Sequence, residues 1–375
     1  MPQHRVPAEV FPPGEFIRDE LEERGWTQTD LAEILGRPLR LVNELIAGKK
    51  QITPDTAQGL AEAFGTDAIL WMNLDSQYRL ARIQRTDDSV RRRSSLYAKF
   101  PVRELVKRRW IEQSGQIDVL EERVKQFYEI ECLDEEPSFA HAAMATQYVK
   151  RTNLQWGWLY RAKRLAEVLT PPPYSSKKLQ AALTKLKEML ISPEAIRLVA
   201  RVLNDAGVRF VIVEFLPGSK IDGATFWIND SPVIAMSIRY DRIDNFWFVL
   251  RHECEHVLRG DGRENGVLDV DLMENLGGDG PEEEIAANDA AQKFLVPPAE
   301  IENFIARVRP LYSEERVLLF SKRIGVHPGI VVGQLQRKKE VPYSHFRKHQ
   351  VKVRQIVTQT ALADGWGDTP DLEGQ

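Results

Sequence analysis

Cysteine is scarce in this sequence, which contains only Cys132 and Cys254 among 375 residues. Two cysteines so far apart do not form the framework of a disulfide-rich domain, and they fit a reducing compartment. No stretch approaches the ~18 uninterrupted apolar residues of a membrane span. The first residues also lack a basic segment followed by an apolar one, as a signal peptide would have. We therefore expect a cytoplasmic protein without a membrane segment.

An excess of charge of one sign is lacking as well. The chain has 51 Lys and Arg residues against 55 Asp and Glu residues, so its formal net charge is -4. A nucleic acid would therefore have to be bound by a local patch. The length, with 43% hydrophobic residues, suffices for two or three cores, so we expect several domains.

The first part of the chain has the pattern of short helices with clear boundaries. Thr27, with Asp30 three residues later, is typical of a capping box, and Gly36 ends the helix that follows. Thr53 and Pro54 mark another helix start. The stretch TQTDLAEILGRPLRLVNELIAGKK contains a helix, a turn and a second helix, which predicts a helix-turn-helix.

This stretch resembles the Xre/Cro repressor family. PGEFIRDELEERGWTQTDLAEILG and the later AFGTDAILWMNLDSQYRL are most similar to its HigA-type antitoxin branch, over about residues 12 to 82. In such a fold, the helix after the turn places its first residues on base edges in the major groove. That geometry predicts DNA contacts by Leu39, Arg40 and Asn43 at the bases, by Gln28 in the preceding helix, and by Lys49 and Lys50 at phosphates.

The charge of this part does not favour DNA. Residues 1 to 85 contain 10 Lys and Arg residues and 13 Asp and Glu residues, a difference of -3. Phosphate neutralisation supplies most non-specific affinity, so an acidic module binds weakly unless it dimerises. We expect binding of double-stranded DNA, with protein docking or homodimer formation through the same fold as the alternative.

After Gly207 the hydrophobic pattern changes from the helical period to the period of strands. VRFVIVEFL, GATFWI and PVIAMSI are rich in Val, Ile and Phe, and turn-forming residues separate them, which predicts a small antiparallel sheet. The helical period returns near Asp241, where FWFVLRHECEHVLRG follows. A Gly- and Asp-rich loop is predicted over residues 260 to 281, before a helix that begins at EEEIAANDAAQKFLVPP.

The motif HECEH has the spacing of a metal site. His252 and His256 lie four residues apart on one face of a helix and can direct their imidazoles at one ion. The helix is apolar on most sides, so these polar groups would be costly to bury unless a cation compensates them. A catalytic zinc site needs a third protein ligand and an open position for water. Glu253 stands where a general base would act on that water.

The third ligand is expected from the helix that begins near residue 282. Glu284 and Asn288 are four residues apart and share a face, which would place a ligand and a supporting amide together. Glu282 and Glu283 remain alternatives, because the helical phase does not separate neighbours near a helix start.

HECEH, followed by E-x-x-x-N-x-x-A and a hydrophobic-Pro ending, is similar to the ImmA/IrrE family of zinc-dependent metallopeptidases over about residues 195 to 340. The resemblance implies Zn²⁺ held by His252, His256 and Glu284, with Asn288 beside them. It implies a zincin-like domain that hydrolyses a peptide bond in a protein target, typically a repressor or antitoxin. Ala286 and Ala290 depart from the family pattern at packing positions.

Two residues outside the motif are candidates for stabilising the transition state. Tyr240 precedes the motif helix and His327 precedes a later one, so either side chain could approach a developing oxyanion. A structural role is the alternative for both. For the whole chain, the alternative is a non-catalytic transcriptional regulator or antitoxin that uses the peptidase fold as a sensor or interaction domain.

The expected architecture is of the α+β class. It has an all-α helix-turn-helix domain, a helical middle region, and a zincin-like domain whose antiparallel sheet packs on the HExxH helix. The expected boundaries are residues 12–85 for the helix-turn-helix domain, 86–190 for the linker and helical scaffold, 191–345 for the metallopeptidase domain, and 346–375 for a C-terminal helix and flexible tail.

Overall fold

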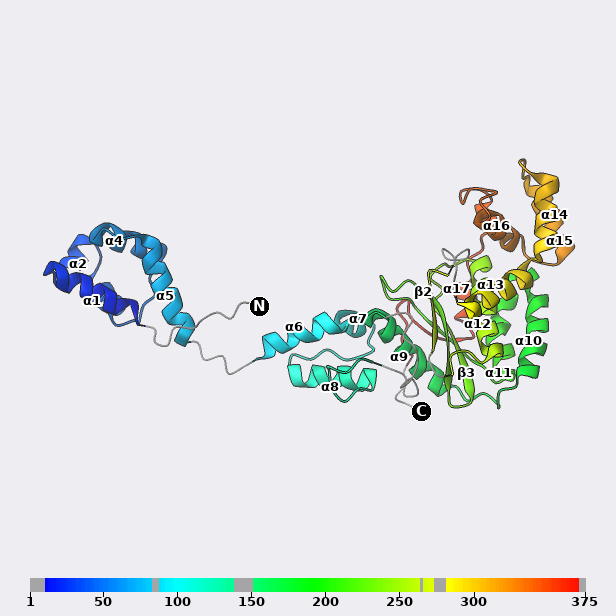
Figure 1. The fold of residues 1–375 in the computed structure, drawn as a ribbon, viewed down its shortest axis with the longest axis horizontal. Helices are drawn as coiled ribbons and strands as arrows, with labels where there is room; N and C mark the ends of the chain where they lie inside the picture. Colours follow the sequence, from blue (N-terminus) through cyan, green and yellow to red (C-terminus); the bar gives the residue numbers. More distant parts are fainter. Residues whose placement is uncertain (1–10, 83–87, 138–150, 264–265, 273–280, 371–375) are drawn as a thin grey trace. The chain divides into compact units, whose positions relative to one another are not determined.

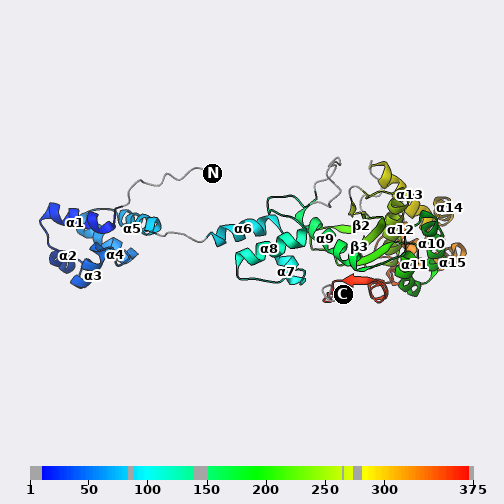
Figure 2. The same cartoon turned by 90° about the horizontal axis from the view of Figure 1, so that it is seen from below.

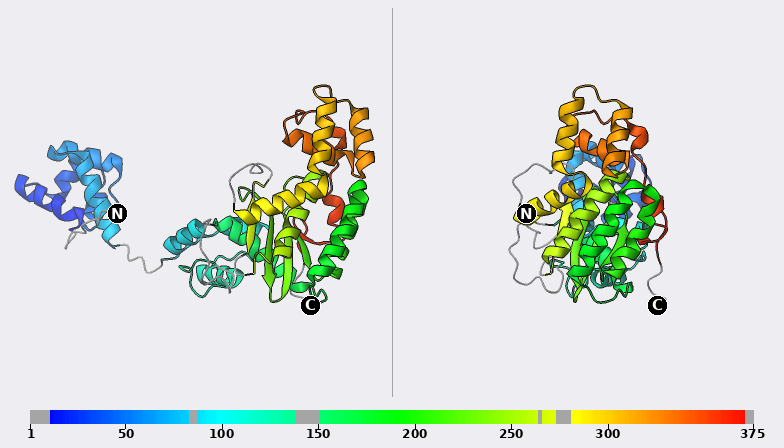
Figure 3. Two further views of the ribbon diagram at one scale, coloured as in Figure 1. Left: turned by 45° about the vertical axis from the view of Figure 1, so that its right-hand side comes forward. Right: turned by 90° about the vertical axis from the view of Figure 1, so that its right-hand side faces the viewer.

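The computed structural model of the protein describes residues 11–82, 88–137, 151–263, 266–272 and 281–370. The chain forms two compact units, Met1–Asp88 and Ser89–Gln375, drawn in Figures 1 to 3. Among the described residues, no helix combines the length and the hydropathy that a transmembrane segment requires.

The N-terminal unit is helical throughout its described part. Its buried residues, among them Ile17, Leu31, Val42, Leu60 and Trp71, form one apolar core. The helices are α1 (Pro13–Arg24), α2 (Gln28–Ile34), α3 (Leu39–Ile46), α4 (Pro54–Phe64) and α5 (Ala68–Arg82).

The predicted helix starts in this unit are confirmed. Thr27 Oγ1 accepts a hydrogen bond from the Asp30 backbone N–H at 3.2 Å, and Asp30 Oδ2 accepts one from the Thr27 N–H at 2.6 Å. Thr53 caps α4 by accepting from the N–H of Thr56, and Pro54 opens the helix. Each bond satisfies a donor that the first helical turn leaves without an intrahelical partner.

The C-terminal unit is built on a five-stranded mixed sheet in the order β4-β2-β3-β1-β5. The strand β2 pairs antiparallel with both β3 and β4, whereas β1 pairs parallel with both β3 and β5. The strands are β1 (Arg209–Val213), β2 (Ile221–Ile228), β3 (Ser231–Met236), β4 (Val267–Val270) and β5 (Leu362–Asp364).

The prediction of an antiparallel sheet is therefore wrong in part. The hairpin of β2 and β3 exists, but β1 lies on the other side of β3 from β2 and runs parallel to β3. The strand β4 lies within the predicted loop, and β5 lies within the predicted C-terminal segment (red in Figure 2). Strands of three and four residues are too short to show a period of two.

Helices cover both faces of this sheet (Figure 1). Phe210, Ile212 and Ile234 belong to one apolar core, which they share with α10, α11 and α12. Val211 and Val213 alternate with them and belong to the opposite core, shared with α6 to α9. Successive strand residues point to opposite faces, so the helices α6 to α9, which lie in the predicted linker and scaffold, pack as one layer of the unit.

The remaining helices follow the chain around the sheet, and α14 to α16 gather at one end of it (Figure 3). The bounds are α6 (Ser89–Lys99), α7 (Val102–Lys107), α8 (Ile117–Tyr128), α9 (Asn153–Val168), α10 (Ser176–Glu188), α11 (Val199–Asp205), α12 (Ile243–Arg259), α13 (Glu282–Leu295), α14 (Pro298–Val308), α15 (Glu314–Ile324), α16 (Pro328–Arg337) and α17 (Arg354–Val357).

The strand β5 is joined to the neighbouring helices by a buried ion pair. Asp364 on β5 accepts a hydrogen bond from Trp110 Nε1 at 2.8 Å and pairs with Arg161 of α9. Both charged side chains are less than 10% exposed. A buried carboxylate requires such partners, so β5 joins segments that are far apart in the sequence.

Candidate functional site

The helix α12 carries the HECEH motif through the centre of the C-terminal unit. Phe246, Trp247 and Val257 are buried in the core, and Gly260, with φ 81°, ends the helix in the left-handed region that favours glycine. His252, Glu253 and His256 are all 0% exposed. The apolar faces of the helix therefore hold the three polar side chains away from water.

Four side chains from three elements meet beside α12. Nε2 of His252 lies 3.0 Å from Nε2 of His256, and Glu284 oxygens lie 3.3 and 3.5 Å from these two nitrogens. Asp269 Oδ2 on β4 lies 3.4 Å from His252 Nε2. One ligand atom of each residue lies within 4.8 Å of all the others. The three predicted ligands are thus close together. Of the three candidate glutamates, Glu284 is the one that belongs to this cluster.

Asp269 was not predicted. It lies in the stretch VLDV, within the region that the composition indicated as a loop. A single acid inside a short β-branched run was the available signal, but pairing with β2 is what turns the side chain toward α12.

Two further oxygens orient the histidine rings. His252 Nδ1 lies 3.1 Å from Asn288 Oδ1, and His256 Nδ1 lies 3.0 Å from Asp261 Oδ2. In the neutral imidazole, a proton on Nδ1 that is donated to these oxygens leaves the Nε2 lone pairs directed at the centre of the cluster. Asn288 was predicted in this place. Asp261, just after the end of α12, was not.

Glu253 is held in an unusual environment. Its Oε2 accepts a hydrogen bond from Thr225 Oγ1 at 2.7 Å. Its Oε1 has no hydrogen-bond partner among the described residues. Burial, and then the nearby charge of Asp269, raise the pKa of Glu253 well above its ordinary value.

Gly223 makes room for this carboxylate. A Cβ at that position would lie 2.0 Å from Glu253 Oε1, closer than any two such atoms can approach. Any side chain on β2 at this position would therefore displace Glu253.

The electrostatics of the cluster favour a bound cation. Burial lowers the pKa of His252, but Asp269 and Glu284 outweigh this effect and raise it to about 10. Burial raises the pKa of Asp269, but the nearby His252 outweighs burial, so that the pKa of Asp269 lies below its ordinary value. The acids thus require positive charge inside the unit, which protons supply in part and a metal ion supplies directly.

The donor set also fits an ion of the zinc type. Two imidazole nitrogens and carboxylate oxygens are typical zinc ligands. Atoms bonded to Zn²⁺ at its usual distance of ~2.0 Å in a tetrahedron lie ~3.3 Å from each other. Four separations within the cluster run from 3.0 to 3.5 Å.

Tyr240 and His327 occupy other surroundings. Tyr240 is 36% exposed and its hydroxyl accepts a hydrogen bond from Arg239. His327 caps α16, where its Nδ1 accepts from the Gly329 N–H at 3.1 Å, and its own N–H binds the Leu190 carbonyl. Burial lowers the pKa of His327. The structure thus gives His327 a helix-capping role, and the transition-state role stays a prediction for both residues.

The predicted DNA contacts all lie on the surface of the N-terminal unit. Val42, Leu45 and Ile46 are the buried face of α3, which leaves the other face of the helix in solvent. Arg40 Nε binds Glu44 Oε1 at 2.8 Å. The residues exposed to solvent include Gln28, Leu39, Arg40, Asn43, Lys49 and Lys50.

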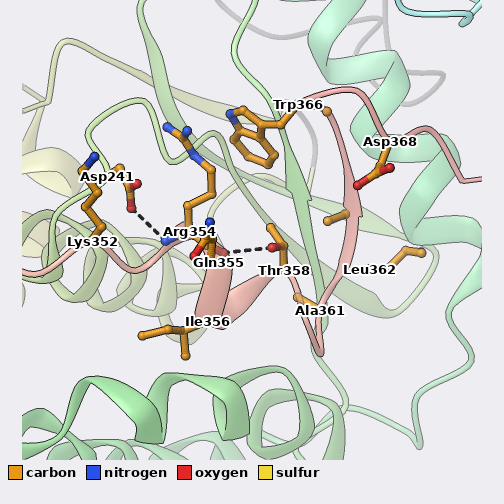
Figure 4. A pocket seen from close by; sticks show the side chains of 12 residues that line it. Asp241, Lys352, Arg354, Gln355, Ile356, Thr358, Ala361, Leu362, Trp366 and Asp368 are labelled. Atoms are coloured by element: carbon orange, nitrogen blue, oxygen red, sulfur yellow. Dashed lines mark hydrogen bonds between the residues drawn. The ribbon is translucent and has the colours of Figure 1, made fainter.

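The C-terminal unit also has a cavity of about 830 Å³ beside the start of α12. Figure 4 shows Arg354 next to the Trp366 ring, whose centroid lies 4.7 Å from the guanidinium carbon. Asp241 Oδ1 accepts from the N–H groups of Val353 and Arg354, so the C-terminal segment is anchored to the residues just before the motif helix. The lining residues are Asp241, Lys352, Arg354, Gln355, Ile356, Thr358, Ala361, Leu362, Ala363, Gly365, Trp366 and Asp368.

The N-terminal unit has the fold of a helix-turn-helix domain, in which α2, a turn and α3 pack on one core. A family profile described as helix-turn-helix matches residues 17–71. By this unit the chain belongs to the helix-turn-helix family.

Two curated proteins and one solved structure are similar to this part of the chain. Virulence-associated protein I of Dichelobacter nodosus is 34% identical over 79 residues, which cover 21% of this chain and 73% of that protein. The uncharacterized HTH-type transcriptional regulator YddM of Escherichia coli K12 is 28% identical over 81 residues, covering 22% and 86%. The structure of PA4674 of Pseudomonas aeruginosa in complex with its operator DNA has 35% identity, covers 21% of this chain and 86% of that one, and has a TM-score of 0.20.

Proposed function

We propose that the protein is a transcriptional regulator that binds double-stranded DNA through its N-terminal unit. The observation that carries this proposal is membership of the helix-turn-helix family over residues 17–71. Similarity to an HTH-type transcriptional regulator of E. coli supports it further. In this fold, the helix after the turn reads the major groove.

The proposed reading surface is the exposed face of α3. Asn43 is suited to bidentate contact with adenine and Arg40 to contact with guanine. Arg40 pairs with Glu44 in the free protein, but the Arg40 side chain is 87% exposed, so this ion pair is weak and DNA competes with it readily. Lys49 and Lys50 would neutralise phosphates without reading sequence.

Selection of binding sites from a random duplex library tests this proposal. We expect a defined sequence to be enriched, and Asn43→Ala to lose about 1–3 kcal/mol of binding free energy on that sequence. Lys50→Ala should weaken binding to all sequences equally and reduce the salt dependence. Gln58→Ala, on the exposed surface of α4, is a matched control. Enrichment of no sequence by the wild-type protein would overturn the proposal.

For the C-terminal unit we propose metal-dependent hydrolysis of a peptide bond in a protein target, such as a repressor or antitoxin. The supporting observation is the buried cluster of His252, His256 and Glu284 with Glu253 beside it. These residues would hold Zn²⁺. A bound zinc ion would supply Lewis acidity at the substrate carbonyl and would lower the pKa of a water molecule.

Side chains of the protein would supply the proton transfer, the orientation of the ligands and the binding of the substrate. Thr225 holds one oxygen of Glu253, which leaves the other oxygen available to take a proton from water and return it to the leaving amine. Asn288 and Asp261 keep the two imidazole rings oriented with their Nε2 atoms toward the ion. The strand β4 is an edge of the sheet, and a substrate peptide would be held there by strand addition.

The alternative is a regulator whose C-terminal unit senses or binds a partner without turnover. Metal analysis of the purified protein, followed by incubation with the product of the neighbouring gene, separates the two readings. Peptidase function predicts new peptide termini, detected by mass spectrometry, for the wild-type protein and none for Glu253→Gln, which should retain its metal and DNA binding. A substrate that is equally cleaved by both proteins would overturn the role of Glu253, and no cleavage by either would favour the regulator.

A further inference from the structure

Asp269 is a buried acid in contact with the proposed metal site. It is 4% exposed, and its Oδ2 has no hydrogen-bond donor among the described residues. That same oxygen lies 3.4 Å from His252 Nε2. A buried carboxylate oxygen without a donor is costly, so its position beside two imidazoles requires a compensating group.

The pairing of β4 with β2 sets the direction of the Asp269 side chain. Asp269 lies directly opposite Gly223 in the pairing of β4 with β2, next to a register shift between Ile221 and Gly223. Residues opposite each other on paired strands share a face, and such irregularities redirect side chains near functional sites. Because Gly223 has no side chain, the Glu253 carboxylate occupies the space over it, next to the strand that carries Asp269.

We propose that Asp269 is a fourth protein ligand and that the metal site is closed in this structure. This inference rests on the metal binding proposed above. Four protein ligands complete the tetrahedron of a zinc site, whereas a catalytic site keeps one position for water. Hydrolysis therefore requires Asp269 to withdraw.

The strand β4 is suited to such a withdrawal. It has four residues and, among the described strands, pairs with β2 alone. An edge strand of this length has few hydrogen bonds that oppose a small shift of its backbone, and such a shift leaves its outer edge open to a substrate strand. The other ligands lie on α12 and α13, which are long helices packed against each other.

Cobalt substitution tests the proposal without any use of peptidase activity. Co²⁺ is added to the full-length metal-free protein, and its visible spectrum is recorded with and without azide, a small anion that binds an open metal position. We expect no response to azide in the wild-type protein and a clear response in Asp269→Ala. Loss of a direct ligand should also lower Co²⁺ affinity about 100-fold or more, beyond the loss typical of a supporting residue.

Three controls make the result decisive. Asp271→Asn changes an acid that pairs with Lys220 and Arg239, and it should behave like the wild type. Asp269→Asn keeps the shape of the side chain and should also lose affinity, and circular dichroism verifies that each variant folds. An equal azide response in wild type and Asp269→Ala would overturn the role of Asp269 alone. A wild-type protein that binds no Co²⁺ would overturn the proposed metal chemistry itself.

Discussion

The two units of this protein differ in how their functional residues are brought together. In the N-terminal unit, the exposed residues of α3 and their neighbours lie within one continuous stretch of the sequence. In the C-terminal unit, the cluster combines α12, β4 and α13 and depends on Gly223 of β2. A surface that local structure creates is visible in a sequence motif, whereas a buried site needs the whole fold. Four predictions test this difference.

The largest effect is expected at the buried ion pair of β5. Asp364→Ala leaves Arg161 and the Trp110 N–H without their partner. We expect a loss of about 3–5 kcal/mol from the unfolding free energy of residues 89–375 and no change in residues 11–82. Hydrogen exchange with mass spectrometry measures each unit separately. Asp134→Ala removes an exposed ion pair and should change stability by about 0.5 kcal/mol or less; equal losses in both variants would contradict the prediction.

Removal of the proposed metal ion comes next. A ligand present at ~100 times its dissociation constant stabilises the folded state by ~2.7 kcal/mol. A chelator should therefore destabilise the C-terminal unit by about this amount and leave the N-terminal unit unchanged, as followed by thermal melting of the two units. His252→Ala should melt alike with and without chelator. A wild-type melt that does not respond would count against a bound metal.

A smaller effect is expected at Gly223. The added methyl group of Gly223→Ala would overlap Glu253 Oε1, and overpacking of this kind costs about 1–3 kcal/mol. Urea denaturation measures the change, and proteolytic activity should fall with it if Glu253 is the base. Gly115→Ala is the matched control, because its Cβ would meet no atom within 4 Å. Retention of full stability by Gly223→Ala would show that Glu253 is free to move.

The smallest effect is expected in the N-terminal unit. Thr27→Ala removes the cap of α2 and should cost about 1 kcal/mol of stability, confined to residues 11–82. Thr29→Ala, at the exposed second residue of the same helix, should leave stability unchanged within about 0.5 kcal/mol. Hydrogen exchange in α2 compares the two variants. A loss of protection in the C-terminal unit would contradict the expectation that the effect is confined to the N-terminal unit.

The sequence was most informative where structure is local. The capping box of Thr27 and Asp30, the cap at Thr53 and the hairpin of β2 and β3 follow from residues close to each other in the chain, and each is present. The spacing of His252 and His256 also determined that both rings share one face of α12, because helical geometry sets that relation by itself.

Tertiary structure decided the rest. Whether β1 pairs parallel or antiparallel, whether VLDV becomes a strand, and whether Asp269 joins Glu284 at the histidines depend on contacts between segments far apart in the chain. Such pairings are chosen by the burial of apolar surface over the whole unit, in which each short strand contributes little. The sequence alone therefore determined the helix-turn-helix and one half of the cluster, and the packing of α12, α13 and the sheet determined which carboxylates complete it.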